Sequence, residues 1–516
     1  MHAFLLLVAP ALLIAAAVLA FRGPAFQPAQ SPKLAELAAI GAFAAALAAS
    51  ASLVAWGPAT SPLVGLFGLG LSVRLDLLSI IMLLLVSFVG WVVLRFSATY
   101  LDGEHRQGPF TGWMATTLAA VMLFVTSGNL VLLVAAWIGT SYALHQLLLF
   151  YPNRAAAQRA GHKKWIVARI GDAGIIAAAL MLVWQFGTGD IAGILANASE
   201  GGALAVAAAV FLAIAALFKS AQFPTHGWLT EVMETPTPVS ALLHAGVINA
   251  GGFLLIRFSD VLITAPGVLA VLVMIGGFTA LFAGLVMLTQ SAVKHSLAWS
   301  TIAQMGFMIL QCGLALFPLA LLHIVAHSLY KAHAFLATGG AVEQVASIRR
   351  PGAVAVPSAA AVGKAFVLAI GIYVLIGFVI GFDGKSPQSI ALGAILIFGV
   401  AYLIAQGLAD AAPSALTLRT GIISVVAAAS YFALQRASEW LMAGTLAATP
   451  APGPLEWALM VLAVLSFGLV AIAQAMFPNW AYHPAAAGLR VHLNNGLYAN
   501  AVFDRLIGGW TAQKTS

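Results

Sequence analysis

Long apolar runs alternate with short polar connections along this chain. A helix needs roughly 20 apolar residues to cross the hydrocarbon core of a bilayer, and about fifteen runs approach that length. The runs lie near residues 2–20, 34–56, 75–96, 112–127, 129–150, 164–185, 203–222, 236–258, 264–288, 296–314, 316–341, 361–381, 389–409, 413–434 and 455–477. The pattern predicts an all-α polytopic membrane protein with about 14–15 transmembrane helices.

The connections alternate in charge. With the N-terminus outside, one set of connections carries a basic group of residues: Arg22, Lys33, Arg106, Arg154, Arg159, Lys163, Lys164, Lys294, Arg349, Arg350 and Arg419. The opposite set carries Arg74, Asp190, Glu200, Asp260, Asp383, Lys385 and Arg436. Lys and Arg are enriched in cytoplasmic connections. We therefore expect the basic side, and with an odd number of spans the tail 478–516, to be cytoplasmic.

Composition excludes several classes of protein. Of the 516 residues, 62% are hydrophobic and 8% are charged, whereas a soluble domain has about 25% charged residues. The net charge of +7 does not indicate a nucleic-acid-binding surface, because the basic residues lie in the connections between apolar runs. Cys312 is the single cysteine, which excludes disulfide, CxxC and self-contained iron–sulfur chemistry. Dinucleotide, Walker and zinc-protease motifs are absent from the sequence, so we expect no catalytic or metal site in this chain.

Polar residues interrupt the apolar pattern after residue 218. Lys219 ends one apolar run, Pro224 breaks the helix, and His244 lies in the next run. A cation in mid-membrane costs about 2.5–3.5 kcal/mol on insertion scales, and a broken helix is tolerated there only against protein or water. We expect a discontinuous helix with Lys219 as a proton carrier and His244 as a relay. The alternatives are a snorkelling lysine and a histidine that is merely a satisfied core residue.

A second polar group lies in the run 316–341. His323, His327 and Lys331 are spaced four residues apart, which places them along one helix face. Such a stripe must face protein or water rather than lipid. Two histidines at this spacing can hold a metal, but no acidic or cysteine third ligand lies nearby in the sequence. The pattern therefore favours proton conduction over metal binding.

Other charged residues are candidates for supporting roles. Arg169 and Asp172 are opposite charges three residues apart, which indicates either an interfacial salt bridge or support for the path. Glu231 and Glu234 flank the break and either partner Lys219 or are solvated. Lys294 is a weaker candidate. The residues together predict a proton or cation path and no hydrolytic site.

The tail 478–516 is less apolar than the spans. Its segment 489–507 mixes aromatic, apolar and polar residues, with loose helical spacing. Two interpretations remain open: an interfacial helix on the lipid bilayer, or a docking segment for a soluble partner.

Several motifs resemble the antiporter-like membrane subunits of respiratory complex I and of Mrp-type cation/proton antiporters. The resemblance covers about residues 70–345 and rests on Arg74-Leu-Asp-Leu-Leu-Ser79, Lys219-Ser-Ala-Gln-Phe-Pro224, Pro236-Thr-Pro-Val-Ser-Ala-Leu-Leu-His244, Leu297-Ala-Trp-Ser-Thr-Ile-Ala-Gln-Met-Gly306 and His323-x3-His327-x3-Lys331. It implies two inverted five-helix repeats, each with a discontinuous helix. The implied organisation is N-terminal helices at 1–111, repeats at 112–258 and 264–409, C-terminal helices at 410–477 and the tail.

The departures from that family are informative. Trp137-Ile138 stands where the family has Trp-Glu, which leaves Asp172 or a glutamate near the break to substitute for the usual carboxylate beside Lys219. The twelfth-helix Ser-Lys-Asp-Glu motif is missing, with Lys385 at best a remnant. The chain continues for only about 40 residues after the last predicted span. A long lateral helix and a quinone-reductase role therefore lose support.

The tail motif Asn495-Gly-Leu-Tyr-x-Asn-Ala-x-Phe-Asp-Arg505 resembles the DabB-type membrane subunits of bacterial inorganic-carbon accumulation complexes. The resemblance implies a location in the bacterial inner membrane and a large cytoplasmic DabA-like partner, similar to zinc-dependent β-carbonic anhydrases. The zinc would belong to that partner. Ion flow would drive one-way hydration of CO2 or uptake of bicarbonate. The alternatives are an Mrp-type antiporter subunit and a proton-pumping subunit of a complex I-like oxidoreductase. A Lys/His path favours H+ over Na+ as the coupling ion.

Overall fold

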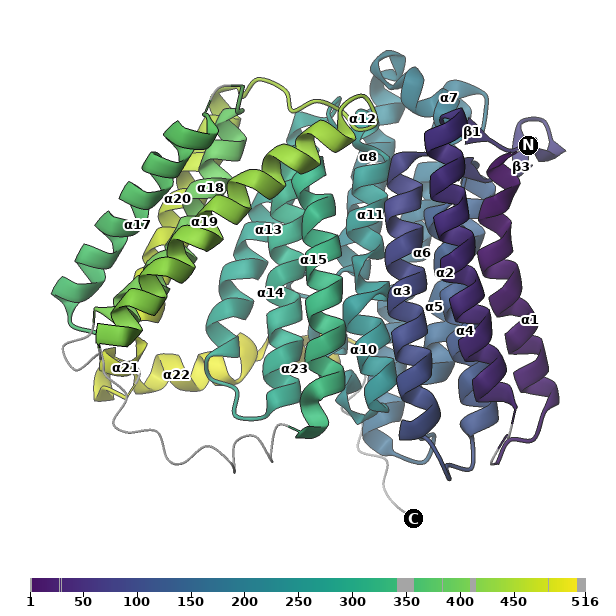
Figure 1. Ribbon diagram of the computed structural model, residues 1–516, viewed down its shortest axis with the longest axis horizontal. Helices are drawn as coiled ribbons and strands as arrows, with labels where there is room; N and C mark the ends of the chain where they lie inside the picture. The colour runs from purple at the N-terminus through teal and green to yellow at the C-terminus, as the bar shows by residue number, and fades with distance from the viewer. Residues whose placement is uncertain are drawn as a thin grey trace.

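The protein is a bundle of long helices that run roughly parallel to one another (Figure 1). The computed structural model describes residues 2–26, 28, 30–340, 357–382, 384–408, 414–480 and 482–507. Arg349, Arg350 and Asp383, three of the predicted connection charges, lie outside the described residues. We call the end of the bundle that carries the short strands the strand end. The opposite end, which carries the last helices of the chain, is the tail end.

Fourteen helices in the described part of the chain are long and apolar enough to cross a membrane. The main helices are α1 (Val8–Arg22), α2 (Ser31–Trp56), α3 (Leu77–Tyr100), α4 (Gln107–Val125), α5 (Leu130–Leu148), α6 (Ala155–Phe186), α8 (Gly202–Lys219), α10 (Thr237–Ala245), α11 (Ala250–Arg257), α13 (Pro266–Met287), α14 (Val293–Gly313), α15 (Phe317–Leu336), α17 (Ala359–Ile380), α18 (Pro387–Gly407), α19 (Ser414–Met442) and α20 (Pro454–Ala475). The predicted polytopic helical fold is confirmed.

Helix α14 crosses the bundle as well, although its mean hydropathy is too low for it to count among the fourteen candidate spans. Lys294, His295 and Gln311 dilute its apolar character. It packs against both α13 and α15, which run in the same direction as each other, so α14 returns the chain to the strand end. The described helices therefore make an odd number of crossings, and the N-terminus and the tail lie at opposite ends of the bundle (Figure 1).

The crossings form two groups of opposite orientation. The first group, α4 to α11, begins at the tail end, and the second group, α13 to α18, begins at the strand end. This arrangement agrees with the inverted repeats that the resemblance implied. The helices α13, α14, α15, α17 and α18 of the second group are each unbroken within the described residues. The expected discontinuous helix in this repeat is therefore not found there, and the observed breaks lie in the first group.

Two short hairpins at the strand end were not predicted. Strand β1 (Ala59–Thr60) pairs with β4 (Arg74–Leu75), and β2 (Val64–Leu66) pairs with β3 (Leu69–Leu71). The two-residue turn between β2 and β3 has positive φ at both Phe67 and Gly68, as a turn matching the twist of a hairpin requires. The strands are too short and too apolar to stand out from the flanking helices.

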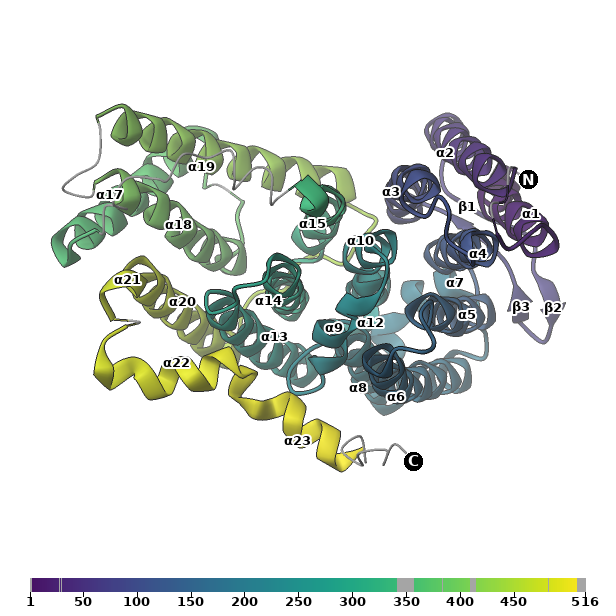
Figure 2. The ribbon, with the colours of Figure 1, turned by 90° about the horizontal axis from the view of Figure 1, so that it is seen from below.

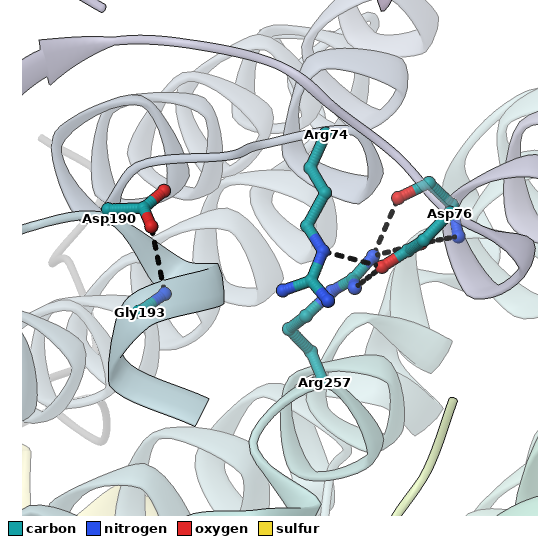
Figure 3. A network of polar contacts seen from close by, with 6 residues as sticks. Arg74, Asp76, Asp190, Gly193 and Arg257 are labelled. Carbon is teal, nitrogen blue, oxygen red and sulfur yellow. Dashed lines mark hydrogen bonds and ion pairs between the residues drawn. The ribbon is translucent and has the colours of Figure 1, made fainter. Parts of the chain in front are cut away.

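A buried ion cluster ties these hairpins to the bundle (Figure 3). We call Arg74, Asp76, Ser79 and Arg257 the Asp76 cluster. Arg257 on α11 forms an ion pair with Asp76, and Arg74 Nε lies 2.8 Å from the same carboxylate. Asp76 also caps α3 by accepting a hydrogen bond from the Ser79 backbone N–H at 2.8 Å. Burial alone would raise the pKa of Asp76, but the charge and hydrogen bonds of Arg257, with Arg74, lower that pKa to about 2.

The last helices lie across the tail end of the bundle, as the view from below shows (Figure 2). They are α21 (Phe477–Trp480), α22 (Ala487–Asn494) and α23 (Ala499–Leu506). Positive φ values at Leu497 and Tyr498 mark the bend between α22 and α23. Val502 and Leu506 on α23 are exposed. This segment therefore packs on the bundle with one side and presents apolar side chains with another.

Candidate ion path

Lys219 is the last residue of α8, and the chain then leaves the helix until α9 (Gly227–Glu231). The discontinuous helix predicted at Pro224 is therefore present. The Lys219 amino group donates to Ser141 Oγ on α5 at 2.6 Å and lies 4.3 Å from the centre of the Trp137 ring. Its amino group thus faces the interior of the bundle, which is the placement expected of a path residue rather than of a snorkelling lysine.

Lys164 joins Lys219 at the same serine. Its amino group donates to the backbone carbonyl of Ser141 at 2.6 Å, and the side chain is buried. The prediction that Lys163 and Lys164 lie in a connection is wrong, because α6 begins at Ala155. The first turns of α6 are too polar to register as part of an apolar run. The side chains of Lys163 and Lys164 contact different segments of the protein. Because these contacts depend on tertiary packing, nothing in the local sequence distinguishes Lys164 from Lys163.

Asp172 is connected to Lys219 by the side chain of Trp137, which contacts both residues. The indole Nε1–H donates to Asp172 Oδ1 at 2.9 Å, and Arg169 Nη2 lies 2.5 Å from the other carboxylate oxygen. Asp172 is buried, whereas the side chain of Arg169 is 40% exposed. Among the contacts of the described residues, Lys219 has no ion pair. The carboxylate expected beside Lys219 is therefore separated from it by the Trp137 ring.

Glu231 and Glu234 point elsewhere. Glu231 accepts a hydrogen bond from Lys163 at 2.6 Å, and Glu234 forms an exposed ion pair with Arg154 at 3.2 Å. Lys163 is buried, and it also contacts Asn500 at 2.6 Å and Asp504, both on α23. The glutamates thus join α9 to α6 and, through Lys163, to the tail. They do not replace the missing partner of Lys219.

A second break, which the sequence did not reveal, follows His244 directly. Helix α10 ends at Ala245, and Gly246 has φ −123° and ψ −77° before a short turn leads into α11. Ser220 Oγ donates to the Ile248 carbonyl at 3.1 Å, and Asn249 Nδ2 donates to Ser328 Oγ at 2.9 Å. These bonds use backbone and side-chain groups at the break and connect α8 to α15. Gly246, one of three glycines in the apolar run 236–258, was the available sequence signal.

A small cavity lies between Lys219 and this second break. Its volume is about 20 Å³, and its lining includes Ser141, Lys164, Lys219, Leu243 and Val247. A cavity needs roughly 10–15 Å³ to hold one water molecule. The cavity therefore has room for a single water between the two lysines and the residues that flank His244.

His244 is linked to Lys331 by two hydrogen-bonding groups of α14. His244 Nδ1 lies 3.0 Å from Thr301 Oγ1, and its ring stacks on Phe335. Thr301 Oγ1 donates to the Leu297 carbonyl at 2.9 Å, and the Lys331 amino group donates to the same carbonyl at 3.1 Å. His244 and Lys331 are both fully buried. His244 of the first group of helices and Lys331 of the second are thus connected through α14.

The stripe on α15 continues from Lys331 away from this junction. His327 is buried, and its ring centre lies 6.0 Å from that of His323. His323 Nδ1 lies 2.9 Å from Gln311 Oε1 on α14. Neither ring nitrogen of His327 has a hydrogen-bond partner within the described structure. The stripe faces the interior of the bundle, as predicted.

Lys294 occupies a different place. It lies at the start of α14 and donates to Thr237 Oγ1 at the start of α10 at 3.1 Å. It joins two helix ends and contacts none of the path residues among its described hydrogen bonds. Sequence reasoning missed Ser141, Lys164, Thr301 and Gln311, because each is defined by a contact between distant segments.

Two protein families match parts of the chain. The membrane domain described as "NADH:quinone oxidoreductase/Mrp antiporter, TM" matches residues 127–355, and "NADH-Ubiquinone oxidoreductase (complex I), chain 5 N-terminus" matches residues 62–111. The first match contains every predicted path residue. These families confirm the resemblance drawn from the motifs.

Individual relatives are more informative. A probable inorganic carbon transporter subunit, DabB2 of Halothiobacillus neapolitanus, is 39% identical over 97% of this chain and 93% of its own length. A probable inorganic carbon transporter subunit, DabB of Hydrogenovibrio crunogenus, is 46% identical over 54% of each protein. Subunit L of the NADH-quinone oxidoreductase of Mycobacterium tuberculosis is 33% identical over 62% of this chain and 52% of its own length.

The fold matches a chain of the Mrp complex from Dietzia sp. DQ12-45-1b. The TM-score is 0.62 and the identity is 22%, over 99% of this chain and 60% of the other. At this identity the match concerns the fold alone. It shows that the whole bundle has the architecture of an antiporter-type membrane subunit and spans about 60% of that neighbour's length.

Proposed function

We propose that this chain, which belongs to the family of DabB-type inorganic carbon transporter subunits, conducts the cation whose flow drives inorganic-carbon accumulation. The observation that carries the proposal is the interior line of polar groups from Lys219 to His323. Hydrogen bonds at Ser141, Thr301 and the Leu297 carbonyl support both halves of that line. Buried ionisable groups in a membrane bundle are costly and typically mark ion or proton paths.

The chemistry of the line favours protons. Lysine and histidine side chains gain and lose protons, and hydroxyl groups can bridge them. A dehydrated sodium ion would need several oxygen ligands at once. We therefore propose H+ as the coupling ion, with Lys219 and Lys331 as carriers and His244, His327 and His323 as relays.

The direct test is carbon accumulation by cells or vesicles that contain the complete complex. Lys219→Ala and Lys331→Ala should each lower accumulation at least tenfold at equal expression. Lys364→Ala is the matched control, because Lys364 is an exposed lysine of α17. Wild-type accumulation in both path variants would sink the proposal. Imposed pH and sodium gradients, applied separately, would identify the coupling ion.

The partner is proposed to be a large cytoplasmic DabA-like subunit with a zinc site similar to that of β-carbonic anhydrases. The support in this chain is the tail, where α22 and α23 present exposed Leu489, Val491, Val502 and Leu506. Helix α23 also contacts Lys163, which pairs with Glu231 after the first break. We place this tail end in the cytoplasm of a bacterial inner membrane, because most basic connections lie there. The transporter subunit itself is then no enzyme, and the carbonic-anhydrase-like chemistry is the partner's.

Gentle purification followed by mass and metal analysis tests the partner. One large zinc protein in stoichiometric amount is the expected result. Several small membrane subunits would instead favour an Mrp-type antiporter, the alternative to which the fold match points. Flavin and iron–sulfur absorption bands would favour a complex I-like oxidoreductase, to which the Mycobacterium relative belongs.

A further inference from the structure

A cavity of about 300 Å³ opens at the strand end of the second half of the bundle. Its walls come from the start of α13, the connection between α14 and α15, the start of α18, residues 450–453 and the start of α20. A cavity needs roughly 10–15 Å³ to hold one water molecule, so this one has room for several. None of the residues assigned to the ion path above belongs to its lining.

One buried polar group in the lining lacks a partner. Gln388 is 3% exposed, and its Nε2 donates to the Pro450 carbonyl at 2.8 Å. That bond fixes the amide, and the other amide atom, Oε1, has no hydrogen-bond partner in the described structure. A buried acceptor without a donor costs about 1–3 kcal/mol. The oxygen itself is buried, so this amide joins α18 to residue 450 in the cavity wall and adds nothing to the charge of the lining.

The charge in the lining of the cavity is negative. Glu456, in the first turn of α20, is the single ionisable residue among the lining residues. The remaining lining is mostly apolar, so the field of this carboxylate is screened less than at an open surface. A cavity whose one ionisable lining residue is a carboxylate favours a cation over an anion.

The floor of the cavity lies close to the ion path. Leu314 belongs to the lining and follows Gln311 by three residues, which is about 4.5 Å along the chain at helical rise. Gln311 Oε1 lies 2.9 Å from His323 Nδ1. Val273, Leu314 and Leu459 are buried residues of the lining. At Leu314 the lining is thus about one helical turn from Gln311, at the end of the polar line.

We infer that this cavity is a vestibule for the transported cation, in which Glu456 attracts the hydrated ion. The identity of the ion rests on the proposed function, but the cation preference of the cavity does not.

Thiol labelling tests the preference without any transport assay. In a Cys312→Ala background, Ala270→Cys places one thiol in the cavity wall, and Ala448→Cys places one on the neighbouring exposed surface. A membrane-impermeant trimethylammonium thiosulfonate and its sulfonate counterpart are added from the strand end. After correction by the surface thiol, the cationic reagent should react at least tenfold faster in the cavity. Glu456→Gln should reduce that ratio at least threefold.

Three outcomes would overturn the inference: equal rates for both reagents, a ratio insensitive to Glu456→Gln, or no reaction in the cavity while the surface thiol reacts. In transport, Glu456→Gln should raise the half-saturating cation concentration about threefold. Glu200→Gln, an exposed carboxylate at the same end, should leave that concentration unchanged. If Lys219→Ala and Lys331→Ala leave transport intact while the labelling preference holds, the proposed path fails and the vestibule stands.

Discussion

In the Asp76 cluster two guanidinium groups contact one carboxylate, whereas along the ion path the buried amino groups contact neutral oxygens. Lys164 and Lys219 donate to Ser141, and Lys331 donates to the Leu297 carbonyl. Both regions lie inside the same bundle. Moving a charge out of water costs several kcal/mol in either place.

The difference lies in what compensates each charge. A counter-charge at hydrogen-bond distance holds a group in its ionised form and joins the segments that carry it. A neutral oxygen stabilises an ammonium group less, so a lysine with such a partner gives up its proton at a lower cost. The Asp76 cluster is therefore built to stay charged, whereas the described contacts of the lysines in the proposed path include no counter-charge that would hold them in one form.

Asp76→Asn should produce the largest loss of stability. It leaves Arg74 and Arg257 without their carboxylate, and removal of one partner of a buried pair costs about 3–5 kcal/mol. Thermal unfolding in detergent at pH 7 measures the loss. The pKa of Asp76 is about 2 in the folded protein and roughly 3.9 when unfolded. Its stabilisation is thus complete above pH about 5 and disappears as the pH falls towards 2.

Glu200→Gln is the control for this variant, because Glu200 is exposed at the same end. An unchanged unfolding temperature for Asp76→Asn at pH 7 would contradict the view that the cluster holds the hairpins to α11.

Lys331→Met should give the opposite result. The variant replaces a buried cation that has a neutral partner with an apolar side chain of similar length, so we expect stability to be unchanged or to rise by about 1 kcal/mol. Transport should fall at least tenfold. Parallel unfolding and transport measurements on one preparation check both parts. A loss of stability as large as that of Asp76→Asn would mean that Lys331 is structural.

Trp137→Phe should have a smaller effect on transport. It keeps an aromatic ring beside Lys219 but removes the N–H that donates to Asp172. We expect transport to fall about three- to tenfold, with a loss of roughly 1 kcal/mol in stability. Trp184→Phe is the matched control, because Trp184 is 83% exposed. Equal transport by both variants would show that Asp172 does not act on Lys219 through the indole.

Asp504→Asn should have the smallest effect of the four. Lys163 keeps Glu231 and Asn500 as partners, so the tail loses about 1 kcal/mol of docking energy. Limited proteolysis of α23 in membranes should become a few-fold faster. Arg505→Gln, on the exposed side of α23, should leave the rate as it is. An equal change in both variants would mean that Lys163 does not hold the tail.

The sequence predicted the features that local chemistry determines. Pro224 after an apolar run located the first break, and the four-residue spacing of His323, His327 and Lys331 placed them on one interior face. The span map was also correct to within a few residues for most helices. These features depend on backbone geometry and on the exclusion of polar groups from lipid.

The rest depends on contacts between distant segments. The role of Ser141 depends on two lysines from other helices, and Thr301 is a link only because α10 and α15, which pack against each other, both approach α14. Gly246 ends α10 where Ser220 and Ser328 are available to bond the freed groups. Lys163 and Lys164 are adjacent in sequence, yet one contacts the tail and the other the path. Residue type and spacing do not contain this information.

The hydrogen bonds at Ser141 have a consequence for stoichiometry. The hydroxyl accepts from Lys219 and the carbonyl accepts from Lys164, so the two amino groups lie beside a single residue. Two ammonium groups so close together repel each other, and the described neighbours offer neither of them a direct carboxylate. A second proton therefore binds less readily once the first is present. In the proposed path, such a pair would hold one positive charge at a time and would pass protons singly.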